Sequence, residues 1–127
     1  MTAIPTLAAL PAAPPASPPV PYAVLLQADL RIGRVLYACP VAGSRENLCQ
    51  VTVDIGEGEI GTAMSKLPGL DPATLPGALV VVACHIEPRT IAGIMATVLL
   101  VTVRSSDRKQ SRLIVPSDTV EPGSQVG

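Results

Sequence analysis

Alternation between apolar and polar residues is the feature that most limits how this chain can fold. Residues 29–39 and 48–56 alternate with a period of two, as expected when the side chains of a strand point to opposite faces. The third expected strand follows a glycine-rich hairpin, and the others are short runs rich in aliphatic residues. These strands lie within residues 56–64 and at residues 78–86, 95–103 and 112–117. The chain therefore has five or six expected strands.

Short turns separate these segments, and no long helices alternate with the strands as they do in parallel sheets. Between the third and fourth strands, Asp71 followed by Pro72 is typical of a helix N-cap with proline at the first helical position. Pro76 and Gly77 end that helix after about one turn. We therefore expect an all-β fold. More specifically, we expect a five-stranded OB-fold barrel with a short helix between strands 3 and 4, plus flanking N- and C-terminal segments.

The first 21 residues differ in composition from the rest of the chain. They contain seven of the fourteen prolines, and proline cannot donate a backbone hydrogen bond to the interior of a sheet or a helix. We expect residues 1–21 to be a flexible Pro/Ala-rich tail and residues 22–127 to be the OB-fold domain. Residues 22–28 are apolar and are expected to form one or two helical turns.

The composition argues against several kinds of partner and site, although a local basic patch remains compatible with it. The formal net charge of −1 gives no overall attraction for nucleic acid, and an aromatic content of 2% predicts an aliphatic core. Cys39, Cys49 and Cys84 are an odd number without regular spacing, and His85 is the only histidine. This set favours semi-buried thiols in a reducing compartment over a disulfide framework or a zinc site.

No catalytic pattern is present: the sequence lacks GxSxG, a P-loop and HExxH. We therefore expect neither an enzyme nor a cofactor. No apolar run reaches the roughly 18–20 residues of a membrane span, and the N-terminus lacks the basic region of a signal peptide. These features predict a cytoplasmic protein without a membrane partner.

A series of short motifs appears in a specific order. It consists of DLRIGRV, VTVDIGE, EIGTAMS, EPRTIAG, TVLLV and a closing VEPGSQVG. From about Tyr22 to Gly127, the chain resembles the free-standing tRNA-binding OB-fold domains, and in particular the CsaA-type proteins, described as secretion chaperones and tRNA binders. The resemblance implies a non-catalytic binding protein whose partners are tRNA or unfolded polypeptide.

The resemblance also implies where RNA would bind. The matching RNA-binding positions lie in the first strand, after the third strand and in the turn after the fourth; they are Arg31, Ser65, Lys66, His85, Arg89 and Gly93. Arg89 is the strongest candidate because it belongs to the turn. Arg31 also reads as a solvated strand charge, and His85 as a structural histidine.

The turn at residues 85–93 departs from the family pattern. In some family members the domain is appended to an aminoacyl-tRNA synthetase. These members carry cations where this chain has Glu87, Thr90 and Ala92, and a lysine of the family is replaced by Met95. Each missing contact with phosphate would cost roughly 1 kcal/mol at a partly exposed site. We therefore expect weakened tRNA affinity. The alternative is a structural or protein-interaction subunit that has kept the OB fold and lost RNA binding.

Two further features have open interpretations. Arg104, Arg108, Lys109 and Arg112 surround a polar loop that also contains Asp107, which indicates either a solvated loop or an anion site. The flanks at residues 22–28 and 112–127 carry more apolar residues than solvated chain ends need. This surplus, with the resemblance, predicts a homodimer, and the alternative is a monomer whose flanks cover the ends of the barrel.

Overall fold

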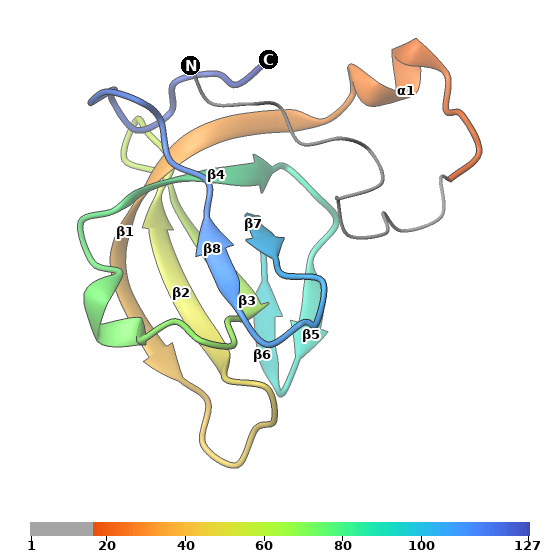
Figure 1. The fold of residues 1–127 in the computed structure, drawn as a ribbon. Coiled ribbons are helices and arrows are strands. Elements are labelled where there is room, and N and C mark those ends of the chain that lie inside the picture. Colours follow the sequence, from red (N-terminus) through yellow and green to blue (C-terminus); the bar gives the residue numbers. More distant parts are fainter. Residues whose placement is uncertain (1–16) are drawn as a thin grey trace, which may run out of the picture.

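The computed structural model describes residues 17–127 and has an all-β fold (Figure 1). Within these residues the strands are β1 (Asp29–Pro40), β2 (Leu48–Asp54), β3 (Ile60–Lys66), β4 (Leu79–Cys84), β5 (Arg89–Ile91), β6 (Ile94–Ala96), β7 (Leu99–Arg104) and β8 (Ser111–Leu113). The helical segments are α1 (Tyr22–Leu25) and the 3-10 helix η2 (Pro72–Thr74). Most of the expected tail, residues 1–16, lies outside the described part of the chain.

Six strands form one antiparallel sheet in the order β3-β2-β1-β4-β7-β8, and β5 and β6 form a separate hairpin. The sheet curls until β3 meets the segment between β6 and β7. There the backbone N–H groups of Thr97 and Val98 donate to the carbonyl of Thr62 at 2.9 and 3.2 Å. In return, the N–H of Thr62 donates to Thr97 Oγ1 at 3.0 Å.

This architecture confirms the all-β prediction but not the predicted strand count. The structure has eight strands in residues 17–127 instead of five, and no continuous ladder closes the sheet into a barrel. One cause is that the strand expected at residues 95–103 is interrupted at Thr97 and Val98, whose N–H groups bond to β3. The other is that residues 89–91 and 94–96 pair with each other.

The main core is aliphatic and lies on one face of the sheet. Strand β2 contributes Cys49, Val51 and Val53, in agreement with its alternating pattern. β4 contributes Val80 and Val82. Cys84 ends β4 and is also buried, and the remaining members come from β1, β3, β7 and the connecting segments; they are Val35, Ile55, Ala63, Leu67, Leu75, Val98 and Leu100.

The alternation of β1 is broken by an irregularity. The register with β2 shifts between Val35 and Tyr37, so that Val35 is buried while Leu36 and Tyr37 are both exposed. Beyond the shift, Ala38 packs against the core. A bulge of this kind moves the inward-facing positions from odd to even residue numbers, which a strict period of two does not predict.

The predicted helix after the third strand is confirmed as η2. Asp71 Oδ1 accepts a hydrogen bond from the N–H of Ala73 at 3.0 Å, and Pro72 is the first helical residue. Leu75 follows it into the core. The apolar segment before β1 forms the single helical turn α1, which stands away from the sheet in Figure 1 and buries none of its residues.

The C-terminal segment lies along β1. The N–H of Ile32 donates to the carbonyl of Ser124 at 2.8 Å, and the N–H groups of Gly123 and Val126 donate to carbonyls of β1 at 2.7 and 2.9 Å. Part of the C-terminal flank is therefore tied to the sheet. Within residues 17–127, no helix has the length and apolar character needed to cross a membrane.

Candidate nucleic-acid interface

A second apolar cluster fixes the β5–β6 hairpin to the main sheet. Its buried members are Leu48 at the start of β2, Met64 in β3 and Ala96 in β6. Ile91 and Ile94 of the hairpin pack against them, together with Val41. One face of the hairpin is therefore anchored by burial of aliphatic side chains, which places its other residues at a defined position beside the end of β3.

The hairpin ends in a two-residue turn. Ala92 and Gly93 both have positive φ, 52° and 78°, as a tight turn between right-twisted strands requires. Nothing lies within 4 Å of the position that a Cβ atom on Gly93 would occupy, so the tip is open. The sequence placed Arg89 on the turn. In the structure Arg89 is instead the first residue of β5, opposite Ala96.

A groove lies between the hairpin, the end of β3 and β7, with a volume of about 430 Å³. Three of the six predicted site residues line it: Ser65, Lys66 and Arg89. Arg104, at the end of β7, is the third cation of its lining. The other residues are mainly aliphatic; they are Leu48, Met64, Ile86, Ile91, Ala96, Val98, Leu99, Leu100 and Thr102.

The cations of the groove differ in their surroundings. Lys66 Nζ lies 3.1 Å from Glu46 Oε2, and both side chains are more than half exposed. Arg104 Nη2 donates to the backbone carbonyl of Lys66 at 3.3 Å, which brings these two positive charges to the same rim. Among residues 17–127, no salt bridge involves Arg89 or Arg104. An anionic ligand would therefore meet two uncompensated guanidinium groups and one lysine that is shared with a carboxylate.

Asn47 positions the rim that carries Lys66. Its Nδ2 donates to the carbonyls of Leu67 and Leu70 at 2.6 and 2.9 Å, and its own carbonyl accepts from the N–H of Leu67 at 3.1 Å. These bonds join the β1–β2 loop to the segment that follows β3. Sequence reasoning missed Asn47, and nothing local in the sequence marks its role.

Sequence reasoning also missed the apolar lining, although one signal was present. Leu48 lies on the face of β2 that otherwise carries Gln50, Thr52 and Asp54, opposite the face that enters the main core. An aliphatic residue at the end of a polar face indicates a second cluster, and here that cluster anchors the hairpin.

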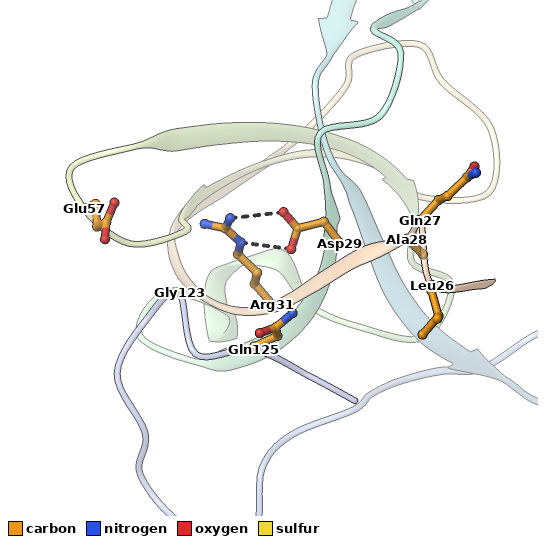
Figure 2. Close-up of a pocket in the computed structure, with 8 residues that line it drawn as sticks. All are labelled: Leu26, Gln27, Ala28, Asp29, Arg31, Glu57, Gly123 and Gln125. Carbon is orange, nitrogen blue, oxygen red and sulfur yellow. Dashed lines mark hydrogen bonds and ion pairs between the residues drawn. The ribbon is translucent and has the colours of Figure 1, made fainter. Parts of the chain in front are cut away.

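Arg31 and His85 do not line the groove but meet at Asp29, near the start of β1. Arg31 Nε and Nη2 each donate to one carboxylate oxygen of Asp29 at 3.0 Å (Figure 2). His85 Nδ1 lies 2.6 Å from Asp29 Oδ2, and its Nε2 lies 3.7 Å from Glu59 Oε1. The Arg31 guanidinium, followed by His85, lowers the pKa of the Asp29 carboxyl. Arg31 and His85 therefore both already have a carboxylate partner.

The depression beside Arg31 is lined by groups that do not favour phosphate. Its volume is about 480 Å³, and its lining includes Asp29 and Glu57 beside Gln27 and Gln125 (Figure 2). Two carboxylates face one guanidinium that is already in an ion pair. Five of the six predicted site residues are thus divided between a groove with cations on its rim and a separate region rich in carboxylates, and Gly93 lies at the hairpin tip.

The three cysteines lie in different surroundings. Burial raises the pKa of Cys49 and of Cys84, which keeps both protonated. The expectation of three semi-buried thiols is wrong, because Cys39, beyond the irregularity in β1, is exposed and Cys49 and Cys84 are fully buried. No cluster of three or more His, Cys, Asp or Glu side chains suited to a metal ion occurs in residues 17–127.

A small antiparallel sheet with an open, cation-rimmed groove defines a binding domain. The sequence from residue 30 to residue 125 matches the family described as "Putative tRNA binding domain", and the chain belongs to this family. It is 36% identical over 98 residues to the methionine--tRNA ligase of Myxococcus xanthus (strain DK1622), and 30% identical over 99 residues to that of Methanopyrus kandleri. The alignments cover 76% and 77% of this chain but only 14% of each relative.

Solved structures share the fold at lower sequence identity. The chaperone CsaA of Bacillus anthracis superposes with a TM-score of 0.74 at 21% identity, covering 87% of this chain and all of that protein. The MetRS related protein of Pyrococcus horikoshii superposes with a TM-score of 0.77 at 19% identity, with the same coverage. This chain therefore shares its fold with these two proteins, each of which it matches over its whole length.

Proposed function

We propose that this protein is a non-catalytic, cytoplasmic tRNA-binding protein that uses the groove between the β5–β6 hairpin and the end of β3. Family membership supports tRNA as the ligand. OB-folds bind oligonucleotides on the face of their second and third strands and on the adjoining loops, and we assign this chain to that arrangement. The start of β2 and the end of β3 contribute Leu48, Met64, Ser65 and Lys66 to the groove, which supports this assignment. The observation that carries the proposal is the gathering of Lys66, Arg89 and Arg104 around one apolar floor.

The proposed roles of the site residues follow from their places. Lys66 and Arg89 would contact phosphates from opposite sides of the groove, and Ser65 would donate a hydrogen bond from its floor. Gly93 leaves the hairpin tip open for close approach of the RNA backbone. Arg31 and His85, both held by Asp29, would support the end of β4 instead of contacting RNA.

We further propose that the affinity is modest. The hairpin carries Thr90 and the exposed Met95 at positions where the resemblance implies cations, and Glu46 shares the charge of Lys66. The groove lining contains no aromatic residue, so bases would contact aliphatic side chains and gain less than the ~1–3 kcal/mol per base of aromatic stacking.

The test is a titration of the protein with total tRNA at low and moderate salt. Each cation that contacts phosphate contributes about 0.7–0.9 to the slope of log K against log salt. Arg89→Ala should weaken binding and lower the slope by about that amount. Arg34→Ala removes an exposed cation of β1 outside the groove and should leave the slope unchanged. Absence of wild-type binding at low salt would reject the proposal and favour the protein-interaction alternative.

We also propose that the protein is a homodimer whose interface is formed by the exposed apolar flanks. In the monomer, these flanks would be open to unfolded polypeptide. Tyr22, Leu25 and Leu26 are 74%, 59% and 65% exposed around α1, and Val115 after β8 is 59% exposed. A two-fold dimer would bury the same patch on both copies and place two weak RNA sites on one particle. Sedimentation should give twice the 13.0 kDa of one chain. Leu25→Asp with Leu26→Asp should give the monomer, and a wild-type monomer would exclude this assembly.

A further inference from the structure

The near-neutral net charge conceals a separation of charges. Six of the nine lysines and arginines lie on the hairpin, at the end of β3 or between residues 104 and 112; they are Lys66, Arg89, Arg104, Arg108, Lys109 and Arg112. Half of the ten carboxylates lie at the start of β1, around the β2–β3 turn or near the C-terminus; they are Asp29, Asp54, Glu57, Glu59 and Glu121.

These two groups occupy different ends of the molecule. In Figure 1 the β2–β3 turn and the C-terminus lie at the top, whereas the β5–β6 hairpin and the loop that leads into β8 lie in the lower half. A polyanion would therefore be attracted to one end and repelled from the other, whatever the net charge of the chain.

The loop at residues 105–110, between β7 and β8, is continuous with the rim of the groove. At its start, Arg104 donates to the carbonyl of Lys66. At its end, the N–H of Ser111 donates to the carbonyl of Pro68 at 2.7 Å, and the Gln110 side chain lies over Gly69. Both ends of the loop are thus fixed to the segment that follows β3, directly beside Lys66.

Hydrogen bonds inside the loop use its only carboxylate. Asp107 Oδ1 accepts from Ser105 Oγ at 2.6 Å and from the N–H of Lys109 at 3.0 Å. Ser105 Oγ in turn accepts from the N–H of Gln110 at 3.1 Å. The hydroxyl of Ser105, followed by the N–H of Lys109, lowers the pKa of the Asp107 carboxyl. Asp107 therefore shapes the loop from within, and its charge is directed at the loop backbone.

The cations of this segment remain available to a ligand. Arg104, Arg108, Lys109 and Arg112 are exposed, and no salt bridge involves any of them within residues 17–127. Four cations face one carboxylate between residues 104 and 112, a surplus of three positive charges. Arg112 Nη1 donates to Gln110 Oε1 at 3.1 Å and to the Ser111 carbonyl at 2.8 Å, which orders its guanidinium on the surface.

We propose that this β7–β8 loop is a second phosphate-contacting surface, so that bound RNA continues from the groove past Lys66 and Arg104 onto Arg108, Lys109 and Arg112. The inference rests on the proposed function of the groove. RNA is favoured over an acidic peptide because the loop prolongs a groove with an apolar floor for bases. Exposed cations of this kind contact the phosphate backbone without reading sequence. The loop thereby supplies charge that the hairpin lacks at Thr90 and Met95.

The test compares two double variants that remove the same charge. Arg108→Gln with Lys109→Gln should lower the salt slope for tRNA binding by about 1.4–1.8. Arg34→Gln with Arg45→Gln removes two exposed cations that do not line the groove and form no salt bridge within residues 17–127, and it should leave the slope unchanged. For an RNA of about four nucleotides, which is the lower end of OB-fold site sizes, the loop variant should bind like the wild type because the groove alone accommodates it.

The outcomes separate this inference from the proposed function. If the wild type binds tRNA, Arg89→Ala weakens binding and the loop variant matches the wild type, the loop surface is rejected and the groove stands. If the wild type does not bind tRNA at low salt, the proposed function fails as well. If polyglutamate competes with tRNA as strongly as unlabelled tRNA does, the loop is a general anion surface and the assignment to RNA is overturned.

Discussion

Glu46 and Lys66 form an ion pair across the end of the groove, with Lys66 Nζ 3.1 Å from Glu46 Oε2. The two residues belong to different elements: Glu46 lies in the β1–β2 loop and Lys66 ends β3. Because Asn47 ties that loop to the segment after Lys66, the pair is held in place by its neighbours. A phosphate that approaches Lys66 must therefore compete with a carboxylate of the same chain.

Glu46→Gln should consequently strengthen tRNA binding and steepen its salt dependence by up to about 0.7–0.9. Stability should change little, because exposed ion pairs contribute only ~0–1 kcal/mol. Glu57→Gln is a matched control, since Glu57 is also exposed and has a φ of 54°, against 58° for Glu46. Equal gains for both variants in a tRNA titration would indicate a net-charge effect and not competition for Lys66.

The hairpin offers the reciprocal experiment. Glu87 precedes β5 and Thr90 is exposed within it. Glu87→Lys with Thr90→Arg should tighten tRNA binding and raise the salt slope by about 1.4–1.8 if both new cations contact phosphate. The control is the same pair of changes combined with Arg89→Ala, which should lose about one contact. If the restored hairpin binds no better than the wild type, RNA does not use this face of the hairpin.

Gly61 permits the contact between β3 and the β6–β7 junction. A Cβ atom at position 61 would lie 2.7 and 2.9 Å from the two methyl carbons of Val98, a buried β-branched side chain with restricted rotamers. Gly61→Ala should lower the free energy of unfolding by about 1–3 kcal/mol through overpacking. Denaturant unfolding measures this loss. The double variant with Val98→Ala should lose less than the sum of the two single variants, and additive losses would contradict the predicted clash.

The sequence predicted the parts of this fold that local rules control. The period of two in β2 identified Cys49, Val51 and Val53 as one face, and that face enters the core. Asp71 and Pro72 predicted η2 because capping depends on residues two or three positions apart. The break between β6 and β7 was not predictable in this way, because it follows from bonds to Thr62, 35 residues from Thr97.

The candidate site also combines residues that the sequence could predict with residues whose roles depend on distant contacts. Lys66 and Arg89 were identified from charge and from the family resemblance, and the structure brings both to one groove. The roles of Arg104 and Asn47 depend on carbonyls of Lys66 and Leu67, which no pattern near those residues reveals. The resemblance placed Arg31 with the RNA-binding residues, and the sequence analysis did not anticipate its ion pair with Asp29, only two positions away.

The proline-rich segment gives a prediction about domain limits. Residues 17–20 are exposed, and α1 buries none of its residues. Deletion of residues 1–21 should therefore leave the melting temperature of the domain at residues 22–127 nearly unchanged. Scanning calorimetry of both forms provides the comparison. A fall of several degrees would mean that the segment packs on the domain.

Asp29 gives a prediction about pH and stability. Arg31, followed by His85, lowers its pKa in the folded protein below the ordinary value of about 3.9, so the folded state binds the proton less readily than the unfolded chain. The resulting stabilisation is fully present above about pH 4 and is lost as the pH falls through the lowered pKa. Asp29→Asn should therefore be less stable than the wild type at pH 7, and the difference should shrink as the pH falls below about 4. Urea unfolding of both proteins across this range is the measurement. A constant difference would mean that the asparagine acts through packing, and that the contacts of Asp29 with Arg31 and His85 do not favour its ionised form.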